Sequence, residues 1–252
     1  MLTGKKFLIT GITNKQSIAY GIAKSMYDKN AILAFSYKNK KIKNRIKLLA
    51  NDFNSNIVIP CDVSEDINIK KLFFDLKKKW KKFDGFIHSI AYADKKSLNG
   101  NFIKNLNKNQ FSISHEITSY SFSALAKESI KMLNPGSSLI TISFLGSSKV
   151  IPNYNVMGLA KASLESNVRY MAYALSDKNI RVNAISAPAI KTVSSVSIYN
   201  FKQYIKQRNK NSLFKSSITT YDIGNVASFL CSDLSKSISG QVIYSNGGDN
   251  IV

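Results

Sequence analysis

The residues best suited to chemistry in this sequence are a tyrosine and a lysine, Tyr154 and Lys161, in the segment 151–163. On a helix, this spacing falls about 20° short of two turns, so both side chains lie on one face, roughly 10 Å apart along the axis. A nearby ammonium lowers the pKa of a phenol from about 10, and it can also hold ribose hydroxyls. The phenol can hydrogen-bond an oxygen on which negative charge develops. We predict that both are catalytic; the alternative is a core tyrosine and a surface lysine.

A turn near the N-terminus has the residues needed to hold an anion. Gly11 allows a tight turn, Ser17 can cap the helix that follows, and the free amides beyond it point toward an anion. Gly21 is expected to let that helix pack closely on a strand. The spacing from Gly11 to Ile18 is a stretched form of a dinucleotide-binding fingerprint. The alternative is an ordinary turn between a strand and a helix.

Two further positions follow later strands. Asp62 comes directly after a strand that ends at Cys61, and Ala91 follows the end of the next strand. A carboxylate at 62 can accept a hydrogen bond from an adenine amino group, and a small residue at 91 lets the backbone approach a ribose. In the alternative interpretation, Asp62 caps a helix that starts near Glu65. In a parallel sheet these strand ends share one edge, where ligands bind.

The elements that must position these residues alternate along the chain. Apolar runs such as 7–9 and 139–142 lack polar alternation, which indicates strands covered on both faces. We predict strands near 5–10, 31–37, 56–60, 83–90, 137–144, 180–186 and 241–245. We predict helices near 17–29, 67–80, 108–133, 156–177 and 220–232. The sequence therefore predicts an α/β fold in one domain, 1–252: a Rossmann-type doubly wound parallel sheet of about seven strands with helices on both faces.

One segment interrupts this alternation. Residues 193–212 combine polar side chains with Tyr199, Phe201 and Tyr204. Long insertions of this kind are usually lids or binding loops. We therefore predict a substrate-binding lid at about 193–207, with a solvated amphipathic helix that never moves as the alternative.

The formal net charge of +21 comes almost entirely from lysine, since Arg occurs only at 45, 169, 181 and 208. A nucleic-acid reader is expected to use arginine and to cluster its charge, so biased codon usage explains this composition better than a nucleic-acid partner. Two cysteines exclude a disulfide framework, and two histidines argue against a metal site. No apolar run reaches the roughly 18 residues that span a bilayer, and we find no signal peptide. We expect a cytoplasmic protein without membrane insertion.

Several motifs resemble those of one family. They are Ser17-Ile-Ala-Tyr-Gly21, His88-Ser-Ile90, Ile151-Pro-Asn-Tyr-Asn-Val-Met-Gly-Leu-Ala-Lys-Ala-Ser163, Arg181-Val-Asn-Ala-Ile-Ser186 and Phe229-Leu-Cys-Ser-Asp-Leu234. Over essentially its whole length the chain resembles the bacterial enoyl-[acyl-carrier-protein] reductases of type II fatty acid synthesis, a divergent branch of the short-chain dehydrogenase/reductases. Six residues separate the tyrosine from the lysine in that family, as they do here. Tyr20 with Lys24 and Tyr37 with Lys41 match the commoner three-residue separation of short-chain dehydrogenases, but they are predicted on other elements.

The resemblance implies reduction of the trans-2 double bond of an enoyl thioester on acyl carrier protein, by hydride transfer from NADH, in a homotetramer. It implies that Tyr154 is the catalytic tyrosine and that Lys161 binds a cofactor ribose. The other implied cofactor contacts are Gly11, Ser17 and Ile18 at the pyrophosphate, Asp62 and Val63 at the adenine, Ile90 at the adjacent ribose, and Ile190 and Thr192 at the nicotinamide. The implied substrate contacts are Ala93, Tyr154, Phe201 and Tyr204.

Four departures from the family pattern accompany this resemblance. Phe144 replaces a second tyrosine, Ala91 replaces a glycine, and the proline of the segment 187–190 is shifted by one residue. Lys38 stands where a glutamine is frequent, so it joins the predicted cofactor contacts and makes NADPH possible beside NADH. The alternatives are another short-chain dehydrogenase or ketoreductase, which the Tyr–Lys spacing argues against, and a non-catalytic protein that retains the fold.

Overall fold

The computed structural model describes residues 1–190, 200, 203–206, 213 and 218–251. Seven strands form one parallel sheet in the order β3-β2-β1-β4-β5-β6-β7. Their bounds are β1 Lys6–Thr10, β2 Ile32–Tyr37, β3 Val58–Pro60, β4 Phe83–His88, β5 Leu133–Phe144, β6 Arg181–Ala187 and β7 Val242–Tyr244. The predicted Rossmann-type doubly wound sheet is confirmed.

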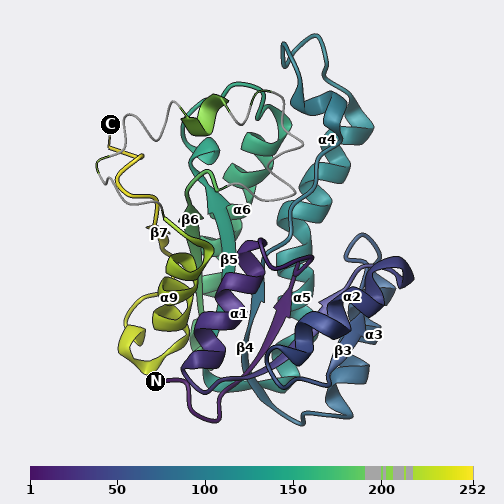
Figure 1. The fold of residues 1–252 in the computed structure, drawn as a ribbon, viewed down its shortest axis with the longest axis vertical. Coiled ribbons are helices and arrows are strands. Elements are labelled where there is room, and N and C mark those ends of the chain that lie inside the picture. The colour runs from purple at the N-terminus through teal and green to yellow at the C-terminus, as the bar shows by residue number, and fades with distance from the viewer. Residues whose placement is uncertain (191–199, 201–202, 207–212, 214–217, 252) are drawn as a thin grey trace.

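Helices cover both faces of the sheet (Figure 1). Their bounds are α1 Ile18–Asp28, α2 Lys40–Asn51, α3 Asp66–Lys77, α4 Lys108–His115, α5 Ser121–Ser129, α6 Val156–Ala174 and α9 Thr220–Cys231. Side chains of α1, α2 and α9 share one buried apolar cluster, and those of α3, α5 and α6 share another. The sheet therefore separates two cores.

The first strand shows why an apolar run without alternation predicts such a sheet. Phe7, Leu8 and Ile9 are all fully buried. Leu8 belongs to the core beneath α3, α5 and α6, whereas Phe7 and Ile9 belong to the core beneath α1, α2 and α9. Successive side chains of a strand point to opposite faces, so each face here needs apolar residues.

Three local predictions were wrong. Helix α2 was not predicted, because its apolar residues form only a narrow stripe, with Ile46, Leu49 and Ala50 buried, in a lysine-rich segment. The helix expected over 108–133 is interrupted by a π-helical turn at Glu116–Tyr120 and a 3₁₀ turn at Ile130–Met132.

The third wrong prediction concerns Gly21, which packs against another helix rather than against a strand. A methyl group at this position would overlap the backbone of Thr220, and one at Gly224 would overlap the Gly21 carbonyl. These glycines therefore allow α1 and α9 to approach each other closely.

Candidate active site

A cavity of about 690 Å³ lies where the strands end. The strand order reverses around β1, with β2 on one side and β4 on the other, and such a reversal opens a crevice at the carboxyl edge of a parallel sheet. The lining of the cavity brings together these predicted site residues: Gly11, Ser17, Ile18, Lys38, Asp62, Val63, Ile90, Ala93, Tyr154, Lys161 and Ile190. Tyr204 packs against the apolar cluster that contains Tyr154. Thr192, Phe201 and most of the predicted lid at 193–207 lie outside the described residues.

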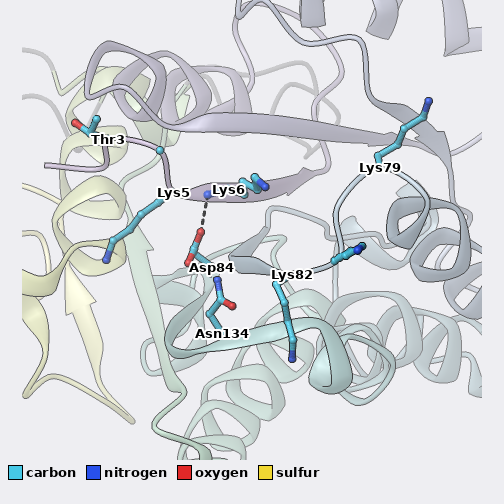
Figure 2. Close-up of a pocket in the computed structure, with 9 residues that line it drawn as sticks. Thr3, Lys5, Lys6, Lys79, Lys82, Asp84 and Asn134 are labelled. Atoms are coloured by element: carbon cyan, nitrogen blue, oxygen red, sulfur yellow. Dashed lines mark hydrogen bonds between the residues drawn. The ribbon is translucent and has the colours of Figure 1, made fainter.

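A second hollow, of about 620 Å³, lies at the amino ends of β1 and β4 (Figure 2). At its centre Asp84 accepts hydrogen bonds from the Lys6 backbone N–H at 2.7 Å and from the Asn134 amide at 2.9 Å. The ammonium groups of Lys5, Lys79 and Lys82 point in different directions (Figure 2). Their charges do not converge on a common point, so we place the candidate site in the cavity at the carboxyl edge.

Tyr154 is only 8% exposed and lies in an apolar cluster at the start of α6. The ring of Phe144 meets it edge to face, with the ring centroids 4.9 Å apart. Burial raises the pKa of Tyr154 well above the ordinary value of 10. The expectation that Lys161 lowers this pKa is therefore wrong, because the cost of burying a phenolate dominates. The phenol is a neutral hydrogen-bond donor at physiological pH.

Lys161 is buried on α6, and its Nζ donates a hydrogen bond to the Ile142 carbonyl at 2.6 Å. Burial lowers the pKa of Lys161 to about 8, and the charge of Glu165 opposes that shift. A carbonyl of β5 thus holds the lysine in place, and the pKa of its side chain lies close to neutral pH.

The spacing of Tyr154 and Lys161 predicts that both lie on one regular helix, but the segment around Tyr154 is not helical. Helix α6 begins at Val156, and Asn155 has φ 40° and ψ −123°, a backbone conformation that is strained for a residue with a side chain. The Asn155 amide donates to the carbonyls of Ser97 at 3.2 Å and Gly100 at 3.3 Å. Asn153 accepts from the Gly100 N–H at 3.1 Å. These bonds hold the tyrosine in the cavity although it precedes the helix.

The first turn has the geometry expected of an anion-binding turn. Gly11 has φ +85°, and a methyl group there would overlap the Ser89 carbonyl. Ser17 caps α1 by accepting a hydrogen bond from the Tyr20 N–H, and the first turn of α1 has no acidic residue. The amino end of a helix without acidic side chains favours an anion.

Asp62 and Lys38, which also line the cavity, form an ion pair with 3.6 Å between Nζ and Oδ2. The Lys38 ammonium also lies 5.8 Å from the ring centroid of Tyr92. Glu65, rather than Asp62, occupies the N-cap position of α3, so the helix-capping alternative for Asp62 is wrong. The Asp62 carboxylate instead accepts from the backbone and hydroxyl of Ser64.

Tyr92 and Met157 are among the cavity-lining residues that sequence reasoning missed. Their signals were weak: Tyr92 lies between two small residues after β4, and Met157 follows Tyr154 by three positions. The competing pairs lie on other elements, as predicted. Tyr20 on α1 donates to Asp52 at 2.9 Å, and Tyr37 ends β2 whereas Lys41 lies on α2.

Within the described part of the chain, no three His, Cys, Asp or Glu side chains gather in a way that could hold a metal ion. In the same part, none of the helices is both long and apolar enough to cross a membrane. Both cysteines are buried free thiols.

Comparison with known proteins relates the chain to one family. The sequence model of the enoyl-(acyl carrier protein) reductases matches residues 11–250. The enoyl-[acyl-carrier-protein] reductase [NADH] of Buchnera aphidicola from Acyrthosiphon pisum is 57% identical over 250 residues, covering 99% of this chain and 96% of that protein.

Two solved structures share the fold over nearly their whole length. The enoyl-[acyl-carrier-protein] reductase (NADH) of Aquifex aeolicus superposes with a TM-score of 0.97 at 41% identity, covering 100% of this chain and 98% of that one. The Bacillus cereus enoyl-acyl carrier protein reductase, solved with NADP+ and an indole naphthyridinone, superposes with a TM-score of 0.96 at 34% identity, covering 99% and 98%. With its Tyr154 and Lys161 facing one cavity, this chain belongs to the enoyl-(acyl carrier protein) reductase family.

Proposed function

We propose that this protein reduces the trans-2 double bond of enoyl thioesters carried by acyl carrier protein, with NADH as the hydride donor, in fatty acid synthesis. The observation that carries the proposal is the meeting of Tyr154 and Lys161 in one cavity with the amino end of α1 and with Asp62. Relatives that cover nearly the whole chain bear the name of this activity and this cofactor.

The cavity residues fit a dinucleotide. The amino end of α1, with Gly11, Ser17 and Ile18, suits a pyrophosphate, and the Lys161 ammonium suits ribose hydroxyls. Asp62 and Val63 would hold the adenine, Ile90 the adjacent ribose, and Ile190 with Thr192 the nicotinamide. When bound, NADH supplies the hydride that adds to the β-carbon of the enoyl thioester.

Tyr154 acts on the charge that develops on the thioester oxygen as the β-carbon gains hydride. Its neutral phenol donates a hydrogen bond to that oxygen from a buried, apolar setting, where such a bond is stronger than in water. Protonation of the α-carbon then completes the saturated acyl product. Phe144 packs against the tyrosine but adds no second hydroxyl.

The acyl chain would pass Ala93 and Tyr204, which both pack against the apolar cluster around Tyr154. Phe201 completes this proposed wall, and the segment 193–207 is proposed to close over the substrate. By family resemblance, we also propose that the protein is a cytoplasmic homotetramer.

An absorbance assay of the purified protein tests the proposed function. We expect NADH oxidation with a short trans-2-enoyl thioester and none with a 3-ketoacyl thioester of the same length. Ketoacyl reduction without enoyl reduction would assign the protein to another branch of the short-chain dehydrogenases. Cofactor binding without either reaction would favour the non-catalytic alternative.

A further inference from the structure

Glu165 accepts hydrogen bonds from both ends of the short turn 143–147 next to the site. It lies on α6 one turn after Lys161. Its Oε1 accepts hydrogen bonds from the hydroxyls of Ser143 at 2.5 Å and Ser147 at 2.6 Å. Ser143 is near the end of β5 and lines the cavity, and Ser147 ends the 3₁₀ turn Leu145–Ser147. One carboxylate oxygen thus ties the turn 143–147 to the helix that carries the lysine.

The turn 143–147 packs directly on the catalytic tyrosine. Besides the contact of Phe144 with Tyr154, Gly146 lies against the same ring: a Cβ there would overlap Cδ1 and come within 2.7 Å of Cε1. A Cβ at Gly158 of α6 would lie 2.7 Å from the Gly146 carbonyl. The turn is therefore held between α6 and the ring, and a displaced turn displaces the phenol.

We propose that Glu165 is a positioning residue for the reaction: it fixes the turn 143–147 so that the Tyr154 phenol meets the thioester oxygen, and its charge supports the Lys161 ammonium. This inference rests on the proposed reductase function. It deepens that function by adding a group that touches neither cofactor nor substrate.

The electrostatic part of the inference depends on the groups that act on Lys161. Glu165, from the same helix, opposes the lowering of the Lys161 pKa by burial. His88, from β4, also interacts with Lys161, but burial lowers its pKa to about 3, so the imidazole is neutral above pH 6. Tyr154 is neutral over the same range, since its pKa is raised. Among these groups Glu165 alone carries a charge that favours the ammonium.

Two substitutions of Glu165 separate its hydrogen bonds to the turn 143–147 from the effect of its charge on Lys161. Glu165→Ala removes the acceptor for both hydroxyls, whereas Glu165→Gln keeps a carbonyl oxygen for them and removes only the charge. Asp177→Asn is the matched control, because Asp177 is an exposed acidic residue beyond the end of α6 and pairs only with the neighbouring Lys178 among the described residues. The measurements are kcat, KM for both substrates, NADH affinity against pH by NADH fluorescence, and amide hydrogen exchange.

We expect Glu165→Ala to lower kcat by about tenfold or more, since small misplacements of a catalytic group are costly. The Ser148 and Lys149 amides, which donate to the Leu145 carbonyl at 3.1 and 3.0 Å, should exchange faster in this variant. Glu165→Gln should keep most of kcat, while the pH above which NADH affinity falls moves downward because Lys161 loses its acidic neighbour. Ser147→Ala, which removes one of the two bonds, should lower kcat by an intermediate factor and serves if Glu165→Ala does not fold.

The inference is overturned if kcat, the exchange of these amides and the pH profile of NADH affinity in the Glu165 variants match those of Asp177→Asn. A lower melting temperature with unchanged kcat and pH profile also overturns it, because that result describes a purely structural residue. A wild-type protein that binds NADH but reduces no enoyl thioester contradicts the proposed function instead. In that case, amide exchange still tests whether Glu165 holds the turn 143–147, and the pH profile of NADH binding still tests whether its charge acts on Lys161.

Discussion

Burial sets the chemistry of the two central residues, Tyr154 and Lys161. It raises the pKa of the phenol and lowers that of the ammonium to about 8, so each group is driven toward its neutral form. The phenol is therefore suited to donating a hydrogen bond rather than to acting as a phenolate. The Lys161 ammonium loses its proton as the pH rises through about 8, so its ability to hold ribose hydroxyls is expected to depend on pH.

Substitution of the two residues should separate their roles. Tyr154→Phe should leave NADH affinity nearly unchanged and lower kcat by about 10²- to 10³-fold, the cost of removing one donor to a developing oxyanion. Lys161→Ala should weaken NADH binding and turnover together. Steady-state kinetics with NADH fluorescence titration measures both effects. Equal NADH affinity in wild type and Lys161→Ala would contradict the binding role of the lysine.

The pH dependence of NADH affinity follows from the lowered pKa of Lys161. Below about pH 8 the side chain is an ammonium that can hold ribose hydroxyls, and above it the neutral amine binds them less well. Affinity should therefore fall as the pH rises from 7 to 9, by at most about tenfold per pH unit. Lys161→Met serves as the control, since its weaker binding should not vary across this range. A flat profile for the wild type would show that the protonation of Lys161 does not matter for binding.

At the scale of elements, the connections after β2, β3 and β4 contribute to the lining of one cavity. Lys38, Asp62 and Tyr92 contribute one side chain each, joined by an ion pair and a cation–π contact. The Lys38 side chain is 54% exposed, so both contacts compete with water and neither holds it firmly. This lysine is free to turn toward a 2′-phosphate, although Asp62 competes for its charge.

Lys38→Gln tests this arrangement through cofactor choice. The wild type should prefer NADH and use NADPH measurably. The substitution should lower kcat/KM for NADPH by a few-fold, the value of one exposed charge pair, and change that for NADH little. Lys40→Gln, at another exposed position after β2, is the control. Unchanged NADPH use in Lys38→Gln would show that this lysine takes no part in binding.

At the scale of the whole molecule, the sheet that separates the two cores also carries buried polar side chains. His88, on β4, is a fully buried titratable group on the side of α3, α5 and α6. Its ring nitrogens hydrogen-bond the hydroxyls of Thr141 and Ser121, both at 2.8 Å. Burial, with the Lys161 charge as a second cause, lowers its pKa to about 3. Burial therefore favours a neutral imidazole at this position.

Stability should consequently fall in mild acid. The unfolded chain protonates His88 near its ordinary pKa of about 6.5, whereas the folded chain resists protonation until about pH 3. The free energy of unfolding should decrease as the pH falls below 6.5, by up to about 1.4 kcal/mol per pH unit. Urea unfolding at pH 7.5 and 5.5 measures this loss. His88→Gln should reduce it, whereas His115→Gln should not; the same loss in both variants would mean that other groups cause it.

Much of this protein follows from local sequence patterns alone. Apolar runs without alternation predict the sheet, because a strand buried on both faces needs apolar residues at every position. The spacing of Tyr154 and Lys161, with the turn from Gly11 to Ile18, predicts the site, because parallel strands end at one edge.

The tertiary structure decided what depends on neighbours distant in sequence. The burial of Tyr154 reverses the expected shift of its pKa, the partner of Gly21 is a helix rather than a strand, and Glu165 acquires its role only where Ser143 and Ser147 approach it. The sequence determined which groups could do chemistry and at which edge of the sheet they would meet. Their protonation and exact placement required packing, because solvent exclusion and contacts between distant segments are absent from any local pattern.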